Sequence, residues 1–65
     1  MMKPFQQRVV EEKSQLDERL QRLMDFIGGD IFLSMKFPER ERLCEQMGVM
    51  RHYSIILGER ISEFT

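Results

Sequence analysis

The first half of the chain carries apolar residues at the spacing of an amphipathic helix. From Leu16 onward they recur every four or three residues, and the run from Phe5 to Ile27 contains neither glycine nor proline. This spacing places the apolar side chains in one narrow stripe along a helix. Pro4 suits a first helical turn because its φ angle is already fixed. We therefore predict a helix over residues 4–27. Its stripe consists of Val9, Leu16, Leu20, Leu23 and Ile27.

The second half of the chain repeats the pattern after a break. Gly28 and Gly29 end the first helix, and one of them suits the left-handed conformation that often follows a helix end. Pro38 and the acidic residues after it mark a new helix start. We predict a second helix over residues 38–64, joined to the first by a connector of residues 28–37. The second stripe consists of Leu43, Met47, Met50, Ser54, Leu57, Ile61 and Phe64.

The connector is too apolar for a free loop. Asp30 can cap a short turn through residues 31–35, and we expect this turn to fold over the end of the two helices. Two stripes and a short connector predict an all-α protein, an antiparallel two-helix hairpin with a short apolar connecting turn. Lys13 interrupts the first stripe, and we interpret it as a side chain that reaches solvent at the fraying N-terminal end.

The second helix has more apolar surface than one partner helix covers. Val49, Tyr53 and Ile56 follow the spacing i, i+4, i+7 beside the stripe. They widen the apolar arc to roughly half of the helix circumference, whereas a two-helix pair needs only about a third of it. A second copy of the chain, forming a dimeric four-helix bundle about a two-fold axis, buries this excess most simply. The alternative is that the connector alone covers it.

Small residues give a second indication of close packing on the same helix. Glycine inside a helix costs about 1 kcal/mol relative to alanine, so Gly48 and Gly58 suggest that something approaches the backbone. Another helix is the simpler interpretation, and a ligand groove is the alternative. We assign the oligomer or partner interface to Val49, Tyr53, Ile56, Leu57, Gly48 and Gly58.

The size of the chain also favours association. Its 65 residues form a single domain, residues 1–65, and a chain this short buries only about 60% of its unfolded surface. One cysteine, Cys44, and one histidine, His52, allow neither an internal disulfide nor a zinc site of ordinary ligand number, and we expect no metal. Oligomerisation is the remaining common source of stability.

Charge and hydropathy bear on the partners and the location. Ten basic residues stand against eleven acidic ones, which argues against a general nucleic-acid binder. The sequence has no run of eighteen apolar residues, so we expect no membrane span. The first residues lead into polar sequence and not into an apolar signal core. We expect a cytoplasmic protein of a bacterial host, whose lone thiol stays reduced.

The residues that could carry chemistry are few. Cys44 and His52 lie eight residues apart, about 80° around the helix, so they do not form a nucleophile and base pair within one chain. Neither a Glu-x-x-His motif nor a glycine-rich phosphate loop is present. We therefore expect no enzyme and no cofactor. For Cys44 we expect a buried or half-buried structural thiol, and for His52 an exposed imidazole or, alternatively, a pH switch or a binding role.

The second helix also carries several cations. In a dimer, two copies could line a groove for a nucleotide or RNA, because arginine binds phosphate through two hydrogen bonds. Five glutamates on the same helix weaken this field, and a solvated face of mixed charge is the simpler interpretation. The contacts for an anionic ligand would be Arg40, Arg51, His52 and Arg60.

Short stretches in both halves resemble a known family. They are Phe5-Gln6-Gln7-Arg8-Val9-Val10-Glu11-Glu12-Lys13, Leu16-Asp17-Glu18, Leu20, Glu41-Arg42-Leu43, Gln46, Met50, Tyr53, Ile56-Leu57 and Arg60-Ile61. Together they resemble short helical-hairpin proteins of phages and prophages, found also in crAss-like phages, whose function is uncharacterised. Gly48 departs from the family pattern. The resemblance implies an accessory protein that binds a host protein, such as a defence or regulatory factor, and needs no active site. Nucleotide or RNA binding is the alternative function.

Overall fold

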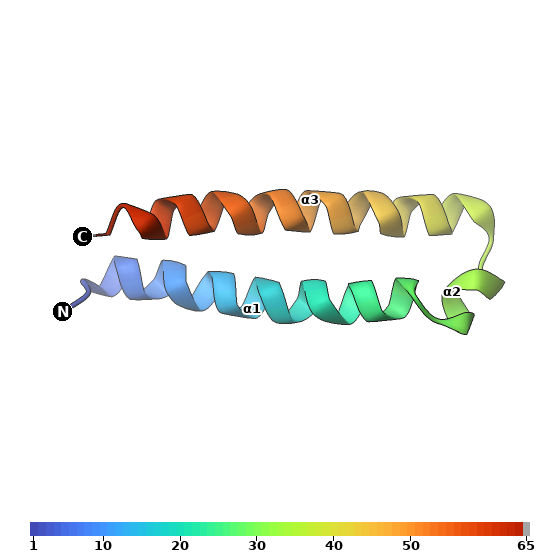
Figure 1. Ribbon diagram of the computed structural model, residues 1–65, viewed down its shortest axis with the longest axis horizontal. Coiled ribbons are helices and arrows are strands. Elements are labelled where there is room, and N and C mark those ends of the chain that lie inside the picture. Colours follow the sequence, from blue (N-terminus) through green and yellow to red (C-terminus); the bar gives the residue numbers. More distant parts are fainter. Residues whose placement is uncertain (65) are drawn as a thin grey trace.

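The computed structural model describes residues 1–64 and confirms that this part of the chain is all-helical. Helix α1 spans Pro4–Ile27, α2 spans Asp30–Ser34 and α3 spans Phe37–Ser62. The two long helices lie side by side and run antiparallel, so both chain ends lie at the same end of the molecule (Figure 1). The chain is thus a hairpin of three helices and not two, because the connector itself folds into α2. The helix expected at 38–64 begins at Phe37 and ends at Ser62.

The helix starts follow from local sequence. Pro4 lies in the first turn of α1, and the Lys3 backbone N–H donates a hydrogen bond of 2.9 Å to Oε1 of Gln6. Pro38 lies in the first turn of α3 together with Glu39. The carboxylate of Glu39 therefore lies close to the positive end of the helix dipole.

The turn after α1 uses ordinary backbone angles. Gly28 has φ −80° and Gly29 has φ −105°, so the left-handed glycine expected here is absent and that prediction was wrong. The Gly28 N–H donates to the Met24 carbonyl at 3.1 Å, and the Gly29 N–H donates to the Phe26 carbonyl at 3.0 Å. These bonds close the last turn of α1, so the chain reverses without a positive φ angle.

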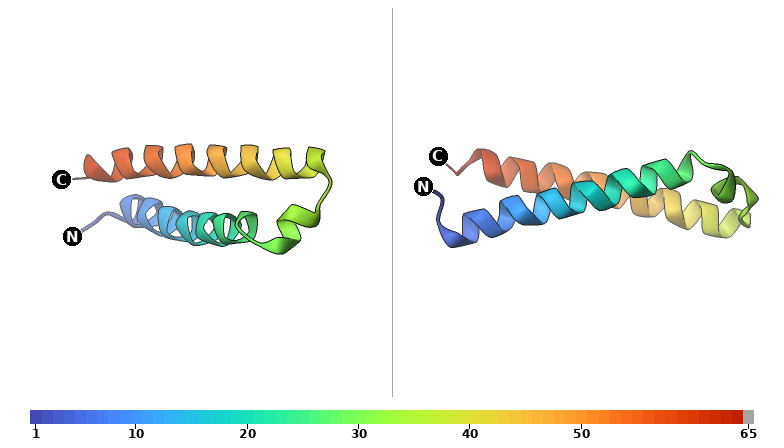
Figure 2. Two further views of the ribbon diagram at one scale, coloured as in Figure 1. Left: turned by 45° about the vertical axis from the view of Figure 1, so that its right-hand side comes forward. Right: turned by 90° about the horizontal axis from the view of Figure 1, so that it is seen from below.

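The core is a thin layer between α1 and α3. Each residue of the two stripes is buried or half-buried, and the centre consists of Val9, Leu16 and Leu57. At the open end, the rings of Phe5 and Phe64 meet edge to face, with centroids 6.1 Å apart. The hairpin measures 48 × 14 × 13 Å, and its long helices cross at an angle when seen from below (Figure 2). It is a rod only two helices thick.

Helix α2 covers the far end of the rod only in part. Phe32 is buried, whereas Ile31 and Leu33 remain 68% and 64% exposed. The expectation that the connector folds over the hairpin end therefore holds for Phe32 and not for its two neighbours. Over residues 1–64, no helix has both the length and the apolar character needed to cross a membrane.

Candidate interaction surfaces

One side of α3 presents apolar side chains to solvent. Val49, Tyr53 and Ile56 are exposed by 69%, 41% and 41%, and we call these three residues the α3 apolar face. They are spaced by four and three residues, so they lie on one side of the helix. The connector does not cover them, and the alternative that it would do so was wrong. Helix α1 packs on the adjacent side of α3.

Leu57 does not belong to this face. It is 0% exposed and lies in the core against Val9 and Leu16. Each residue turns a helix by about 100°, so Leu57 points toward α1 while Ile56 points outward. The assignment of Leu57 to an outer interface is therefore corrected, because its side chain is already fully buried within one chain.

The two helical glycines lie in different surroundings. A Cβ atom added at Gly58 would lie 3.3 Å from Cε of Lys13, whereas one added at Gly48 would meet nothing within 4 Å. Close approach to the backbone at Gly58 thus comes from α1 of the same chain. Gly48 faces open solvent, about 100° around the helix from Val49.

The cations singled out from the sequence lie far apart on α3. Arg40 is half-buried, and Arg51, His52 and Arg60 are exposed. Arg51 and Arg60 are nine residues apart, which places them on opposite sides of the helix. A single chain therefore does not bring these four side chains together.

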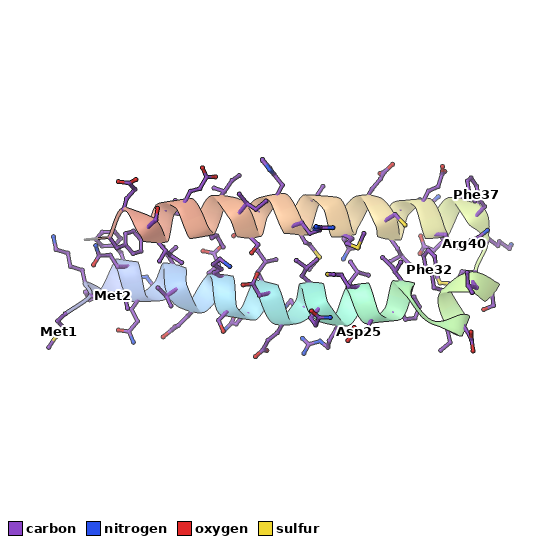
Figure 3. The ribbon with its side chains drawn as sticks, in the orientation of Figure 1. Met1, Met2, Asp25, Phe32, Phe37 and Arg40 are labelled. Atoms are coloured by element: carbon purple, nitrogen blue, oxygen red, sulfur yellow. The ribbon has the colours of Figure 1, made fainter. Side chains whose placement is uncertain are left out.

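Arg40 lies instead in a hollow at the connector end of the rod. This hairpin-end hollow, of about 480 Å³, is lined by Phe32, Phe37, Arg40, Glu41, Cys44 and Glu45. Cys44 is exposed, so the expectation of a buried or half-buried thiol was wrong. The guanidinium carbon of Arg40 lies 5.6 Å from the centre of the Phe37 ring, and Phe32 lies on the α2 side (Figure 3). Within residues 1–64, Nε of Arg40 is buried and has no hydrogen-bond partner. Sequence reasoning had singled out Arg40 and missed its aromatic neighbours, although Phe37 precedes it by three residues, a helical contact distance.

A polar group inside the helix interface was also missed. Ser54 of α3 donates a hydrogen bond to Oδ1 of Asp17, and Lys13 donates one of 2.7 Å to Oδ2 of the same carboxylate. Lys13 is thus half-buried and paired, not extended into solvent as expected. The hydrogen bond from Lys13, followed by that from Ser54, lowers the pKa of Asp17 below its ordinary value of 3.8. The signal in the sequence was Lys13 and Asp17 four residues apart, with Ser54 interrupting the other stripe.

These features define a class: a small all-helical hairpin protein with an uncovered apolar face on its second long helix. Among residues 1–64, no three His, Cys, Asp or Glu side chains are grouped so that they could hold a metal ion. The chain belongs to the Sequestin family, whose family model matches residues 3–63. No curated protein and no solved structure matches it.

Proposed function

We propose that this Sequestin-family chain is a binding protein without catalytic chemistry, which self-associates through the α3 apolar face and holds a partner on the outer surface of the assembly. The observation that carries this proposal is the exposure of Val49, Tyr53 and Ile56 after the hairpin has closed. Burial of apolar surface against protein contributes about 25 cal/mol per Å². Contiguous apolar surface of this kind is typical of interaction sites.

The total surface of the chain supports association. A compact protein of 7.9 kDa exposes about 4,400 Å², whereas this chain exposes 5222 Å². The surplus is roughly 800 Å², the area that one partner contributes to a protein–protein interface of standard size. Two hairpins packed about a two-fold axis, as a dimeric four-helix bundle, would remove about this much surface from water.

The further partner that we propose is a host protein. The sequence resembles phage and prophage accessory proteins, and the family name, Sequestin, hints at binding. A phage protein that blocks a defence or regulatory factor in the bacterial cytoplasm needs only a rigid helical face with a few anchoring side chains. The helices on the outer surface of the assembly would supply such a face.

Two adjacent isoleucines allow a matched test of self-association. Ile55 and Ile56 are exposed by 60% and 41% and point about 100° apart. Light scattering over a concentration series should give a dimer or larger assembly for the wild type and for Ile55→Asp, and a monomer for Ile56→Asp. Equal masses for the two variants, with helix content intact by circular dichroism, would contradict the proposed face.

The same pair tests the biological role. On a bacterial strain that carries a phage-defence system, a phage sensitive to that system should form more plaques when the strain expresses the wild type or Ile55→Asp. Expression of Ile56→Asp should not raise the number of plaques. The comparison requires strains with defined defence systems and equal protein levels. Unchanged plating by the wild type across such strains would count against inhibition of defence.

A second candidate function, the binding of a nucleotide or RNA, is favoured by one observation. The hairpin-end hollow combines a half-buried guanidinium with the exposed ring of Phe37, and Nε of Arg40 is left without a partner there. Arginine binds phosphate, and an aromatic ring stacks on a base. Glu41 and Glu45 also line the hollow and oppose an anion, so this candidate ranks second.

Titration calorimetry with cyclic nucleotides and with a short RNA tests the second candidate. Binding should weaken as salt rises and should be lost in Arg40→Gln but retained in Arg51→Gln, whose side chain lies outside the hollow. The candidate would be ruled out if no binding is detected. It would also be ruled out if the affinity is unchanged by salt and by both substitutions.

A further inference from the structure

The apolar face of α3 continues in both directions as charged and polar residues with the same spacing. Steps of four and three residues lead from Arg42 through Gln46 to Val49, and from Ile56 through Arg60 to Glu63. The helical positions among them lie on the side of α3 that bears Tyr53, and Glu63 follows directly after the last helical residue, Ser62. Arg42, Gln46, Arg60 and Glu63 are exposed. The apolar centre therefore has a polar rim along the helix at each end.

Two copies of this row match each other when the two helices run antiparallel. Val49 stands four residues before Tyr53, and Ile56 stands three after it. Arg42 stands eleven residues before Tyr53, and Glu63 stands ten after it. A two-fold axis beside Tyr53 therefore brings apolar positions against apolar ones and a cation against an acid. Self-complementarity of this kind is what a two-fold interface requires.

We propose that the occupant of the α3 apolar face is a second copy of this chain, bound by an antiparallel contact between the two α3 helices with the two-fold axis beside Tyr53. This inference rests on the proposed self-association and adds its register. In it, Val49 lies against Ile56 of the partner subunit. Arg42 lies opposite the partner's Glu63, and Arg60 lies opposite the partner's Glu45.

The charges select this register over its neighbours. A shift by one step in one direction places Arg42 opposite Arg60 of the partner subunit. A shift of three residues in the other direction places Glu45 opposite the partner's Glu63 and Val49 opposite the partner's Glu59. Like charges in contact across an interface oppose association and so fix its register. Of these three registers, only the one centred beside Tyr53 pairs both arginines with acids.

The residues of the rim are available for these contacts. Arg42 forms an ion pair of 3.1 Å with Glu39 on its own helix, and both side chains are largely exposed, by 71% and 47%. Exposed pairs of this kind contribute only about 0–1 kcal/mol, so Arg42 can exchange one carboxylate for another. The row from Arg42 to Glu63 extends about 30 Å along the helix, which is long enough for a continuous helix–helix contact.

A charge swap tests the register. We would measure the dimer dissociation constant by sedimentation equilibrium for Arg42→Glu, for Glu63→Arg and for the double variant. Each single change places like charges opposite each other at two symmetric sites and should weaken the dimer about tenfold. The double variant restores both pairs and should return to within about threefold of the wild type. Arg51→Glu, on the opposite side of α3, is the control and should leave the constant unchanged.

The outcomes separate this inference from the proposed function. If the single charge reversals behave like Arg51→Glu while Tyr53→Ala weakens the dimer, the face self-associates in another register; the inference then fails and the proposed function stands. If the double variant stays as weak as the single ones, the pairing of Arg42 with Glu63 of the partner subunit is overturned. If the wild type is a monomer at every concentration, self-association fails together with this inference. Circular dichroism of each variant shows whether its helices are intact.

Discussion

At the scale of single residues, the contact that distinguishes this hairpin from a plain apolar helix pair is the carboxylate of Asp17. It accepts hydrogen bonds from Lys13 on its own helix and from Ser54 on the opposite helix. Asp17 lies beside the apolar stripe with its side chain 43% exposed, so a shifted α3 would lose the hydrogen bond from Ser54 while the carboxylate stays partly in water. Asp17 and Ser54 thus help to fix how α1 and α3 are aligned.

The stability of the hairpin should depend on pH through this carboxylate. Because its pKa is lowered in the folded chain below the ordinary 3.8, the folded state favours the charged form. This stabilisation is fully present above about pH 4 to 5 and is lost as the pH falls through the lower pKa of the folded state. Thermal melts from pH 6 to pH 2 should show a smaller acid-induced loss for Asp17→Asn than for the wild type. Ser54→Ala should reduce the loss in part; identical slopes in all three proteins would contradict the assignment.

The two glycines of α3 should respond differently to alanine. Gly48→Ala adds a methyl group in open space and removes backbone freedom from the unfolded chain, so it should stabilise the hairpin by about 1 kcal/mol. Gly58→Ala meets Cε of Lys13 at 3.3 Å, and the displaced lysine should offset much of that gain. Urea unfolding of both variants at low concentration measures the difference. Equal gains would mean that Lys13 moves away without cost.

At the scale of the helices, α3 carries apolar side chains on two adjoining sides, whereas α1 carries them on one side. Leu57 points from α3 into the core, and the adjacent Ile56 points outward. One side of α3 is covered by α1, whereas the neighbouring side that bears Tyr53 is uncovered. A helix with apolar side chains over two adjoining sides needs two partners.

Truncation of the central leucine should show which side carries the stability of the single chain. Leu57→Ala should destabilise the hairpin by about 2–5 kcal/mol, because the side chain is fully buried and the cavity cannot collapse completely. Ile55→Ala, at an exposed position on the same helix, should change stability by no more than about 0.5 kcal/mol. Urea titrations followed by circular dichroism provide both values. A small loss at Leu57 would show that the core lies elsewhere.

At the scale of the whole molecule, the hairpin is unusually extended for its length. Its radius of gyration is 14.9 Å, whereas a compact chain of 65 residues has a value of about 11 Å. A rod two helices thick leaves nearly every side chain with one face in water. Few residues can then be buried, and among residues 1–64 the buried apolar side chains are Val9, Leu16, Phe32 and Leu57. Lateral packing of a second rod is the direct way to deepen such a core.

Lateral packing predicts a characteristic shape and a dependence on concentration. Small-angle X-ray scattering should give a longest dimension below about 60 Å for the assembly, since antiparallel α3 helices overlap over most of their length. End-to-end association would instead nearly double the 48 Å of one hairpin. The melting temperature should rise with protein concentration, because dimerisation favours the folded state. A melting temperature independent of concentration would contradict the proposal.

The sequence by itself determined the secondary structure and the stripe that each long helix buries. The alternation of four and three residues recurs whatever the partner is, and Pro4, Pro38 and the two glycines act locally on the chain. These signals predicted the two long helices and the apolar side of each. They also predicted Val49, Tyr53 and Ile56 as a surface beyond the stripe, which is exposed in the folded chain.

Only the tertiary structure decided which side chains meet across the hairpin. The alignment of α1 with α3 brings Asp17 to Ser54 and Lys13 to Gly58, residues that are far apart along the chain. It also encloses Leu57, and the folding of α2 brings Phe32 beside Arg40. Helical periodicity specifies direction around one axis but not the height at which a second helix is aligned. That height follows from packing and from the hydrogen bond between Ser54 and Asp17, which favours this alignment.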